Sequence, residues 1–194
     1  MALPIEFRNE RSEYLEKEAN KHQAHEFLNL TNDDFMLLGK YIQMYCFIEL
    51  NIHRLFNKLV SEGVVTIKRN KKKSVPYILD KLIDLVKVNF VDSSRVDDII
   101  AKLKEIKYRR DYRNIFAHWA AKKIPNEDAM IFFTGDALDY KKVLNKKIDP
   151  QTVAYAIFDV ADIRGLVDHI NDYEEWIAHF YAEIYERYKK QADN

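Results

Sequence analysis

The chain is poor in residues that interrupt helices and in residues that link distant segments covalently. Its 194 residues include four glycines, four prolines and one cysteine. So few glycines and prolines argue against a turn-rich β architecture and favour long helices. The single cysteine, Cys46, has no partner for an intramolecular disulfide. This indicates a reducing compartment.

The chain also lacks an excess of charge of either sign. It has 31 Lys and Arg against 31 Asp and Glu, and the sequence pI is about 7.0. A protein that binds nucleic acid over its whole surface is normally basic, so any such binding here depends on local patches. No apolar run is long enough to span a bilayer, and the first residues, MALPIEFRNERSEYLEKE, contain no apolar signal segment. We therefore expect a cytoplasmic protein.

What the chain does contain is a composition of 47% hydrophobic and 32% charged residues, which suits a domain with a substantial core. Apolar residues recur at helical spacing in four long stretches. These stretches cover about 32–60, a segment that begins at Ser74 and reaches Phe90, about 95–120, and about 159–190. Short connections between long amphipathic helices favour a helical bundle.

Two shorter features surround the predicted bundle. The charge-rich segment 9–29 predicts a peripheral helix, and the apolar runs AMIFF and TVAYAIF predict two short strands around a Lys-rich hairpin at 141–147. We therefore predict a mainly α fold, an up-down four-helix bundle with an N-terminal helix and a small β-hairpin before the last helix. The expected domains are an N-terminal helical extension over 1–30 and the bundle over 31–190.

The third long stretch changes character toward its end. Its apolar face begins with Val96, Ile99, Ile100, Leu103 and Ile106. Continued at the same spacing, this face passes through Arg110, Arg113, Asn114 and Ala117. A second face stays largely aromatic, with Tyr108, Tyr112, Ile115, Phe116 and Trp119. We expect this end of the helix to line a cleft or meet a partner, and its aromatic residues to serve as core or dimer contacts.

Residues 113–118, RNIFAH, match the R-(N/D/H)-x-x-x-H form of the motif that marks HEPN domains. The first long helix also carries an inward glutamate, Glu49, as HEPN first helices often do. The chain resembles HEPN domains over roughly residues 31–190. The resemblance implies a four-helix bundle that dimerises through the motif-bearing helices. Many members are metal-independent endoribonucleases of toxin–antitoxin or phage-defence systems, and others keep the fold only for binding.

The motif residues suit RNA cleavage without a metal. Such cleavage needs a base for the 2′-OH proton, an acid for the leaving 5′-oxygen and positive charge near the phosphate. His118 can act as base or acid, because imidazole titrates near neutral pH. Arg113 can hold two phosphate oxygens at once with its planar guanidinium. Asn114 can orient the imidazole or hold a phosphate, since positions four apart share a helix face.

The spacing of the motif raises a geometric difficulty. Five residues along an ideal helix rotate by about 140° and rise about 7.5 Å, so Arg113 and His118 do not share a face. Either the helix loosens or bends near His118, or a second subunit brings its own pair to the same cleft. We favour the two-fold dimer, which gathers two arginines and two histidines and offers one imidazole as base and one as acid.

Glu49 is expected to support this site. A carboxylate in an apolar stripe is costly unless it is paired, so we predict that Glu49 anchors Arg110 or Arg113. The candidate RNA-binding cations are Arg109, Arg110, Lys68, Arg69, Lys71, Lys72 and Lys73. A charge run such as the one between Lys68 and Lys73 is more often a solvated loop than an RNA clamp.

We expect neither a metal nor a cofactor. The E-x3-H pairs Glu49–His53 and Glu175–His179 differ from the Glu-x-x-His of di-iron bundles, and no Gly-rich phosphate loop or Cys/His zinc pattern occurs. Some HEPN toxins carry a tyrosine two residues after the histidine, which a partner nucleotidyltransferase can modify. This chain has Ala120 there, so we do not expect that route.

The leading interpretation is a homodimeric endoribonuclease whose partners are RNA and an antitoxin protein. The alternative is a non-catalytic HEPN module that binds a nucleotide, RNA or a protein partner.

Overall fold

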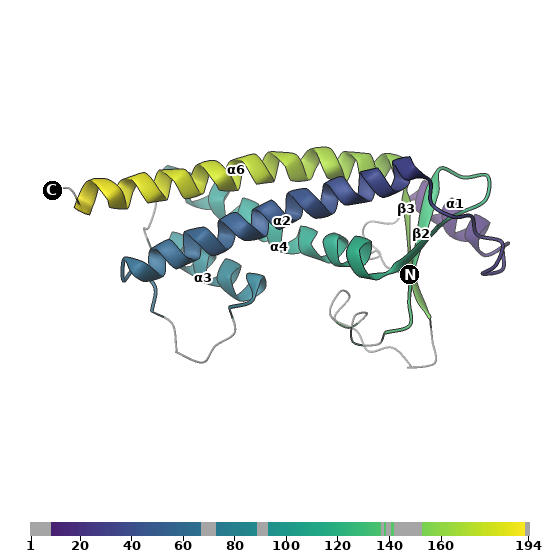
Figure 1. Ribbon diagram of the computed structural model, residues 1–194, viewed down its shortest axis with the longest axis horizontal. Coiled ribbons are helices and arrows are strands. Elements are labelled where there is room, and N and C mark those ends of the chain that lie inside the picture. Colours follow the sequence, from purple (N-terminus) through teal and green to yellow (C-terminus); the bar gives the residue numbers. More distant parts are fainter. Residues whose placement is uncertain are drawn as a thin grey trace. The chain divides into compact units, whose positions relative to one another are not determined.

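The computed structural model describes residues 9–66, 73–88, 93–136, 138, 141 and 153–192 (Figure 1). It is mainly helical, with a small antiparallel sheet. The chain divides into two units. Residues 1–42 and 111–168 form one, here called the sheet unit, and residues 43–110 and 169–194 form the other, the helical unit. The division into an extension over 1–30 and a bundle over 31–190 stays a prediction.

The four predicted long helices are confirmed. They are α2 (Asn32–Ser61), α3 (Val75–Lys87), α4 (Val96–His118) and α6 (Val160–Ala192). A short 3-10 turn, Ser93–Arg95, precedes α4. Helices α2, α4 and α6 each contribute a segment to both units. Among the described residues, no helix has an apolar stretch long enough to cross a membrane.

The helical unit combines segments of these four helices around an aliphatic core. Tyr45 of α2 is fully buried, and its hydroxyl donates to the carbonyl oxygen of Ile106 in α4 at 2.7 Å. At the surface, both terminal nitrogens of Arg95 donate to Glu183 of α6, each at 2.9 Å. Buried apolar contacts and a few hydrogen bonds therefore hold the segments of α2, α4 and α6 together within this unit.

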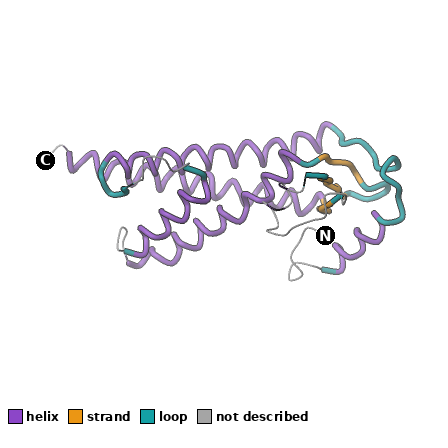
Figure 2. The backbone as a smooth tube through the Cα atoms, turned by 90° about the horizontal axis from the view of Figure 1, so that it is seen from below, coloured by secondary structure: helices purple, strands orange, loops and turns teal. Residues whose placement is uncertain are grey.

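The sheet unit contains helix α1 (Glu10–Ala19) and three strands in the order β1-β2-β3. The strands are β1 (Ala120–Lys123), β2 (Ala129–Thr134) and β3 (Ala154–Asp159), all antiparallel to their neighbours. Figure 2 shows them in orange. Strands β2 and β3 confirm the prediction that the apolar runs AMIFF and TVAYAIF form strands. The predicted hairpin at 141–147 lies, apart from residue 141, outside the described residues.

Helix α1 corrects the expectation of a peripheral helix over 9–29. It ends at Ala19, and Leu15 is 2% exposed within a core cluster. The other buried members of that cluster are Ala19, Phe27, Ile124, Ala129 and Ile131. Arg11 adds ion pairs to Asp159 at 2.7 Å and to Glu127 at 3.0 Å. The segment is therefore part of the sheet unit's core, although its many charged residues suggested otherwise.

An aromatic cluster fixes the end of α4 in the sheet unit. The ring of Phe116 packs against Tyr41 with centroids 5.1 Å apart, and against Phe132 and Phe158 at 5.3 Å each. Tyr112 packs edge-on against Phe158 at 5.7 Å. Aromatic pairs of this kind contribute about 0.5–1.5 kcal/mol beyond their buried area. The cluster thus holds the motif-bearing turns of α4 on the sheet and on α2.

Candidate functional site

Helix α4 remains regular up to the motif histidine. His118 is its last residue, and the next backbone N–H, of Trp119, donates to the carbonyl oxygen of Ile115 at 3.0 Å. The helix therefore does not loosen before His118, and it ends at that residue. Arg113 and His118 project about 140° apart, and one copy of the chain does not place them on one helix face.

The three motif side chains differ in exposure. Arg113 and Asn114 are half-buried, whereas His118 is exposed. Nη1 of Arg113 donates to Oδ1 of Asn114 at 3.3 Å, a long hydrogen bond. The Nε atom of Arg113 is buried and has no hydrogen-bond partner among the described residues. Leaving a buried donor unpaired costs about 1–3 kcal/mol, so the position of this guanidinium is not explained by a contribution to the stability of the fold.

Asn114 was expected either to orient His118 or to hold a phosphate. The hydrogen bond that the structure gives it goes to Arg113. Three residues of the second, largely aromatic face belong to the core, as the sequence predicts for Trp119, whereas Tyr108 and Tyr112 are only partly buried. Ile115, Phe116 and Trp119 are 3%, 6% and 5% exposed. The polar residues are therefore presented from a firmly packed helix end.

Glu49 pairs with one of its two predicted partners. Its Oε1 lies 3.5 Å from Nε of Arg110, and both side chains are partly buried in the helical unit. Arg113 belongs to the sheet unit. Arg109 is also engaged, because its Nε and Nη2 contact Oε1 of Glu105 at 2.7 and 2.6 Å. Both candidate RNA-binding arginines of α4 thus already have carboxylate partners within the chain.

The basic connector is described only at its end. Lys68, Arg69, Lys71 and Lys72 lie outside the described residues. Nζ of Lys73 donates weakly to Oδ1 of Asn57 at 3.4 Å and lies 6.0 Å from the ring centroid of Phe56. Within the described residues, no group of three His, Cys, Asp or Glu could hold a metal ion.

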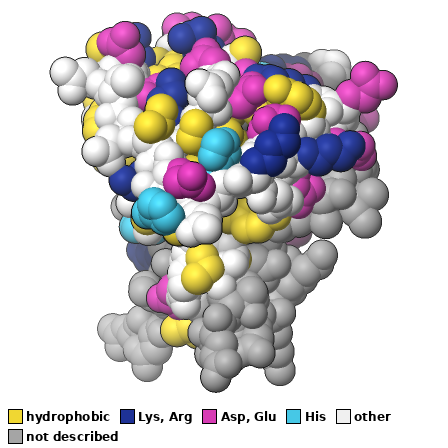
Figure 3. Space-filling model, turned by 90° about the vertical axis from the view of Figure 1, so that its right-hand side faces the viewer, with side chains coloured by type: hydrophobic (Ala, Val, Ile, Leu, Met, Phe, Trp, Pro, Cys, Tyr) yellow, Lys and Arg dark blue, Asp and Glu magenta, His cyan; other side chains and the backbone are white. Residues whose placement is uncertain are grey.

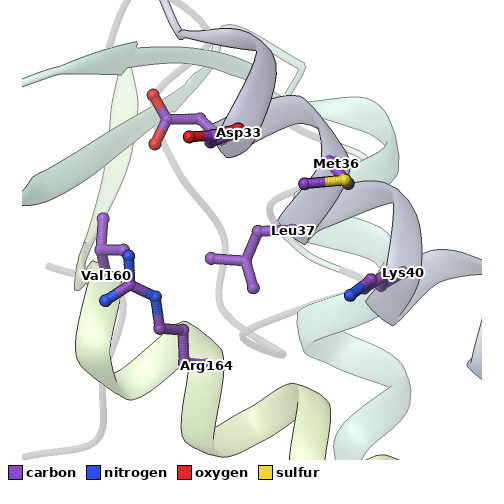
Figure 4. Close-up of a pocket in the computed structure, with 7 residues that line it drawn as sticks. Asp33, Met36, Leu37, Lys40, Val160 and Arg164 are labelled. Atoms are coloured by element: carbon purple, nitrogen blue, oxygen red, sulfur yellow. The ribbon is translucent and has the colours of Figure 1, made fainter.

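Sequence reasoning missed a pocket of about 290 Å³ in the sheet unit, between the starts of α2 and α6 (Figure 4). Its lining residues are Asp33, Asp34, Met36, Leu37, Lys40, Val160 and Arg164. Asp33 and Asp34 lie in the first turn of α2, where acidic residues commonly complement the helix dipole, and no motif surrounds Arg164. Only the packing of α6 beside α2 brings these residues together, so no local signal could have found the site.

Asp34 is the buried carboxylate among the residues that line this pocket, and it is 5% exposed. Its Oδ2 accepts hydrogen bonds from the backbone N–H and the hydroxyl of Thr31, both at 2.8 Å. Nζ of Lys123 lies 3.3 Å from Oδ1. Burial of the Asp34 carboxylate raises its pKa, but the hydrogen bonds from Thr31 and the charge of Lys123 outweigh burial and leave the pKa below its ordinary value.

The surface around the sheet unit is electrostatically mixed. Figure 3 shows acidic and basic side chains interspersed over the face it presents, with histidine side chains among them. No family model, curated protein or solved structure matches the chain. Its function must therefore be inferred from the chemistry of its own residues.

Proposed function

We propose that this chain is a metal-independent endoribonuclease of the HEPN type, which acts as a homodimer with a composite cleft. The observation that carries the proposal is the polar end of α4. There an exposed imidazole, His118, lies about one and a half turns beyond Arg113, whose guanidinium is incompletely paired among the described residues. Because one helix points these side chains apart, a second subunit must complete the site.

The chemistry follows from the two side chains. One imidazole removes the proton of a ribose 2′-OH, and the 2′-oxygen attacks the adjacent phosphorus. The bond from phosphorus to the 5′-oxygen breaks, and the imidazole of the other subunit protonates that oxygen. The guanidinium of Arg113 donates to the non-bridging oxygens as their charge grows. The products are a 2′,3′-cyclic phosphate and a 5′-hydroxyl.

The same proposal covers the finer architecture. We propose that α2, α3, α4 and α6 form an up-down bundle of the HEPN type and that copies associate through α4. The segments that these helices contribute to the helical unit support it. Glu49 would brace α4 through Arg110, three residues before Arg113. Such an enzyme would act on RNA in the cytoplasm, in a toxin–antitoxin or phage-defence setting, with an antitoxin protein as its partner.

Cleavage of a labelled RNA by the purified protein, in the presence of a chelator, tests the proposal. We expect cleavage to persist with the chelator and to fall at least about 100-fold in His118→Ala and Arg113→Ala. RNA with methylated 2′-hydroxyls should remain intact. His25→Ala is a matched control, since His25 is another exposed histidine of the sheet unit.

Two results would count against the enzyme. Full activity in His118→Ala would remove the imidazole from the chemistry, and loss of activity with the chelator would show that a metal is needed. Saturable binding of RNA by the wild-type protein without any cleavage would favour the non-catalytic module instead.

A further inference from the structure

Two opposite charges border the pocket at the starts of α2 and α6 without pairing with each other. Asp33 of α2 and Arg164 of α6 are exposed, and neither side chain makes a hydrogen bond or an ion pair among the described residues. Asp34, by contrast, already accepts hydrogen bonds from Thr31 and lies beside Lys123. The carboxylate of Asp33 and the guanidinium of Arg164 therefore remain available to a ligand.

Apolar side chains flank the space between these two charges. In Figure 4 the guanidinium of Arg164 lies beside Val160, across the pocket from Asp33. Leu37 projects into the space between the two helices and forms the other flank. It also lies between Arg164 and Lys40, so these two cations do not form a joint site for one anion. The pocket thus has an acidic side, a cationic side and apolar flanks.

Hydrogen bonds hold both helix starts that carry the pocket. At the start of α2, Thr31 and Asp34 cap each other, since the backbone N–H of Asp34 donates to the Thr31 hydroxyl at 3.2 Å and the hydroxyl donates back to the carboxylate at 2.8 Å. At the start of α6, the backbone N–H of Val160 donates to the carbonyl oxygen of Asp128 at 2.9 Å. The pocket is therefore formed in advance, which lowers the entropic cost of binding.

We propose that this pocket binds a free α-amino acid with an aliphatic side chain. Asp33 accepts hydrogen bonds from the ammonium group of the ligand, and the planar guanidinium of Arg164 binds its carboxylate in a bidentate way. Leu37 and Val160 contact the aliphatic side chain. Met36, which is 58% exposed, has a flexible side chain that can cover it. A zwitterion compensates both unpaired groups at once.

Ligands with charge of only one sign fit this pocket less well. An anion such as phosphate would bind one guanidinium but would meet the carboxylate of Asp33, and an amine would meet the guanidinium of Arg164. A volume of about 290 Å³ lies at the lower limit of small-molecule sites, so it suits a single amino acid. None of the lining residues belongs to the Arg113–His118 motif, so the inference goes beyond the proposed function.

Nuclear magnetic resonance of the full chain, labelled at the methyl groups of its four methionines, tests the pocket. Met36 lines the pocket, whereas Met130 is buried in β2 of the same unit and is not among the lining residues. Met36→Leu assigns the signal of Met36. We expect titration with L-leucine to shift this signal saturably and to leave the signal of Met130 unchanged.

Blocked forms of the ligand separate the contributions of its two charges. N-acetyl-L-leucine lacks the ammonium group and L-leucinamide lacks the carboxylate, so each should bind at least about tenfold more weakly than L-leucine. Glycine keeps both charges but leaves the apolar flanks uncovered, so it should also bind more weakly. Inorganic phosphate should cause no saturable shift.

Substitutions assign the binding to named residues. Asp33→Asn and Arg164→Gln should each weaken binding of L-leucine about tenfold. Lys40→Ala is the matched control, because Leu37 separates Lys40 from Arg164, and it should change the affinity less than about twofold. The three substituted side chains are exposed, so circular dichroism should show folded variants.

Four outcomes would overturn the pocket proposal: no saturable shift of the Met36 signal with L-leucine, equal affinity for L-leucine and either blocked form, a saturable shift with inorganic phosphate, or unchanged affinity in either Asp33→Asn or Arg164→Gln. None of them affects the nuclease proposal, which stands or falls on cleavage of RNA by the wild-type protein.

Discussion

Glu49 of α2 and Arg110 of α4 form an ion pair within the helical unit, with Oε1 and Nε 3.5 Å apart. Nε of Arg110 is buried and makes no hydrogen bond among the described residues, so the contact is electrostatic and without good hydrogen-bond geometry. The side chains are 20% and 31% exposed, which leaves each charge only partly hydrated. Each group therefore depends on the other for compensation of its charge.

Removing the carboxylate should destabilise the fold moderately. In Glu49→Gln, the guanidinium of Arg110 stays partly buried without its counter-charge, and we expect a loss of about 1 kcal/mol in the free energy of unfolding. Urea denaturation at neutral pH measures this change. Asp84→Asn is the control, because Asp84 and Lys81 form a mostly exposed pair at 3.8 Å. Equal effects of the two substitutions would show that the Glu49–Arg110 pair stabilises the fold no more than an exposed ion pair does.

The lowered pKa of Asp34 predicts an acid-sensitive stability. A carboxyl group whose pKa is lower in the folded protein stabilises that state at pH values above its unfolded pKa, about 3.9. This contribution is lost as the pH falls through the folded pKa. Asp34→Asn should cost about 2 kcal/mol at pH 7, through the weakened hydrogen bonds from Thr31 and the lost contact with Lys123.

Urea denaturation between pH 7 and pH 3 measures that effect. The difference in stability between wild type and Asp34→Asn should shrink as the pH falls below 4. Asp33→Asn, at the exposed neighbouring position, should follow the wild-type curve within about 0.5 kcal/mol. If the difference in stability between wild type and Asp34→Asn were the same at every pH, the effect of the substitution would not depend on ionisation of Asp34, and the prediction would be wrong.

Helical periodicity was sufficient to predict the long helices, because each has buried residues that recur at 3.6-residue spacing, such as Ile99, Leu103 and Ile106 in α4. Strand β1 could not be predicted in this way. Its sequence, AAKK, consists of residues that are depleted in strands. It is a strand because β2 pairs with it on one side and the backbone of Leu28 bridges Lys123 on the other. Such pairing depends on segments distant in the sequence, so the residues of β1 alone do not predict a strand.

The same distinction applies to the candidate site. The RNIFAH motif identified the polar end of α4, and the cost of an inward carboxylate predicted a cation beside Glu49. The choice of Arg110 over Arg113 required the three-dimensional arrangement. So did the pocket that Lys40 and Arg164 both line, because these residues are 124 positions apart in the sequence and come from the starts of α2 and α6.

Helix α1 should be required for the stability of the sheet unit. Leu15→Ala would leave a cavity among Phe27, Ile124 and Ile131, and core truncations of this kind cost about 3 kcal/mol. Thermal denaturation followed by circular dichroism measures the loss. Lys17→Ala changes an exposed residue of the same helix and should shift the midpoint little. Comparable shifts for both variants would mean that the helix, and not the buried leucine, dominates the effect.

A composite cleft makes one further prediction, about dimers in which the two subunits differ. If one imidazole removes the 2′-OH proton and the imidazole of the other subunit protonates the 5′-oxygen, one mutant subunit disables the shared cleft. A dimer with one wild-type and one His118→Ala subunit should then lose nearly all RNA cleavage. If each subunit acted alone, the same dimer would keep about half of the wild-type activity.

Co-expression of the two chains with different affinity tags, followed by sequential purification, yields the mixed dimer. A mixed dimer of wild type and His25→Ala, prepared in the same way, controls for the tags and should be fully active. Size-exclusion chromatography with light scattering establishes that each sample is a dimer. Half activity in the His118→Ala mixed dimer, or an active wild-type monomer, would contradict the shared cleft. The 140° separation of Arg113 and His118 on regular α4 would then need another explanation.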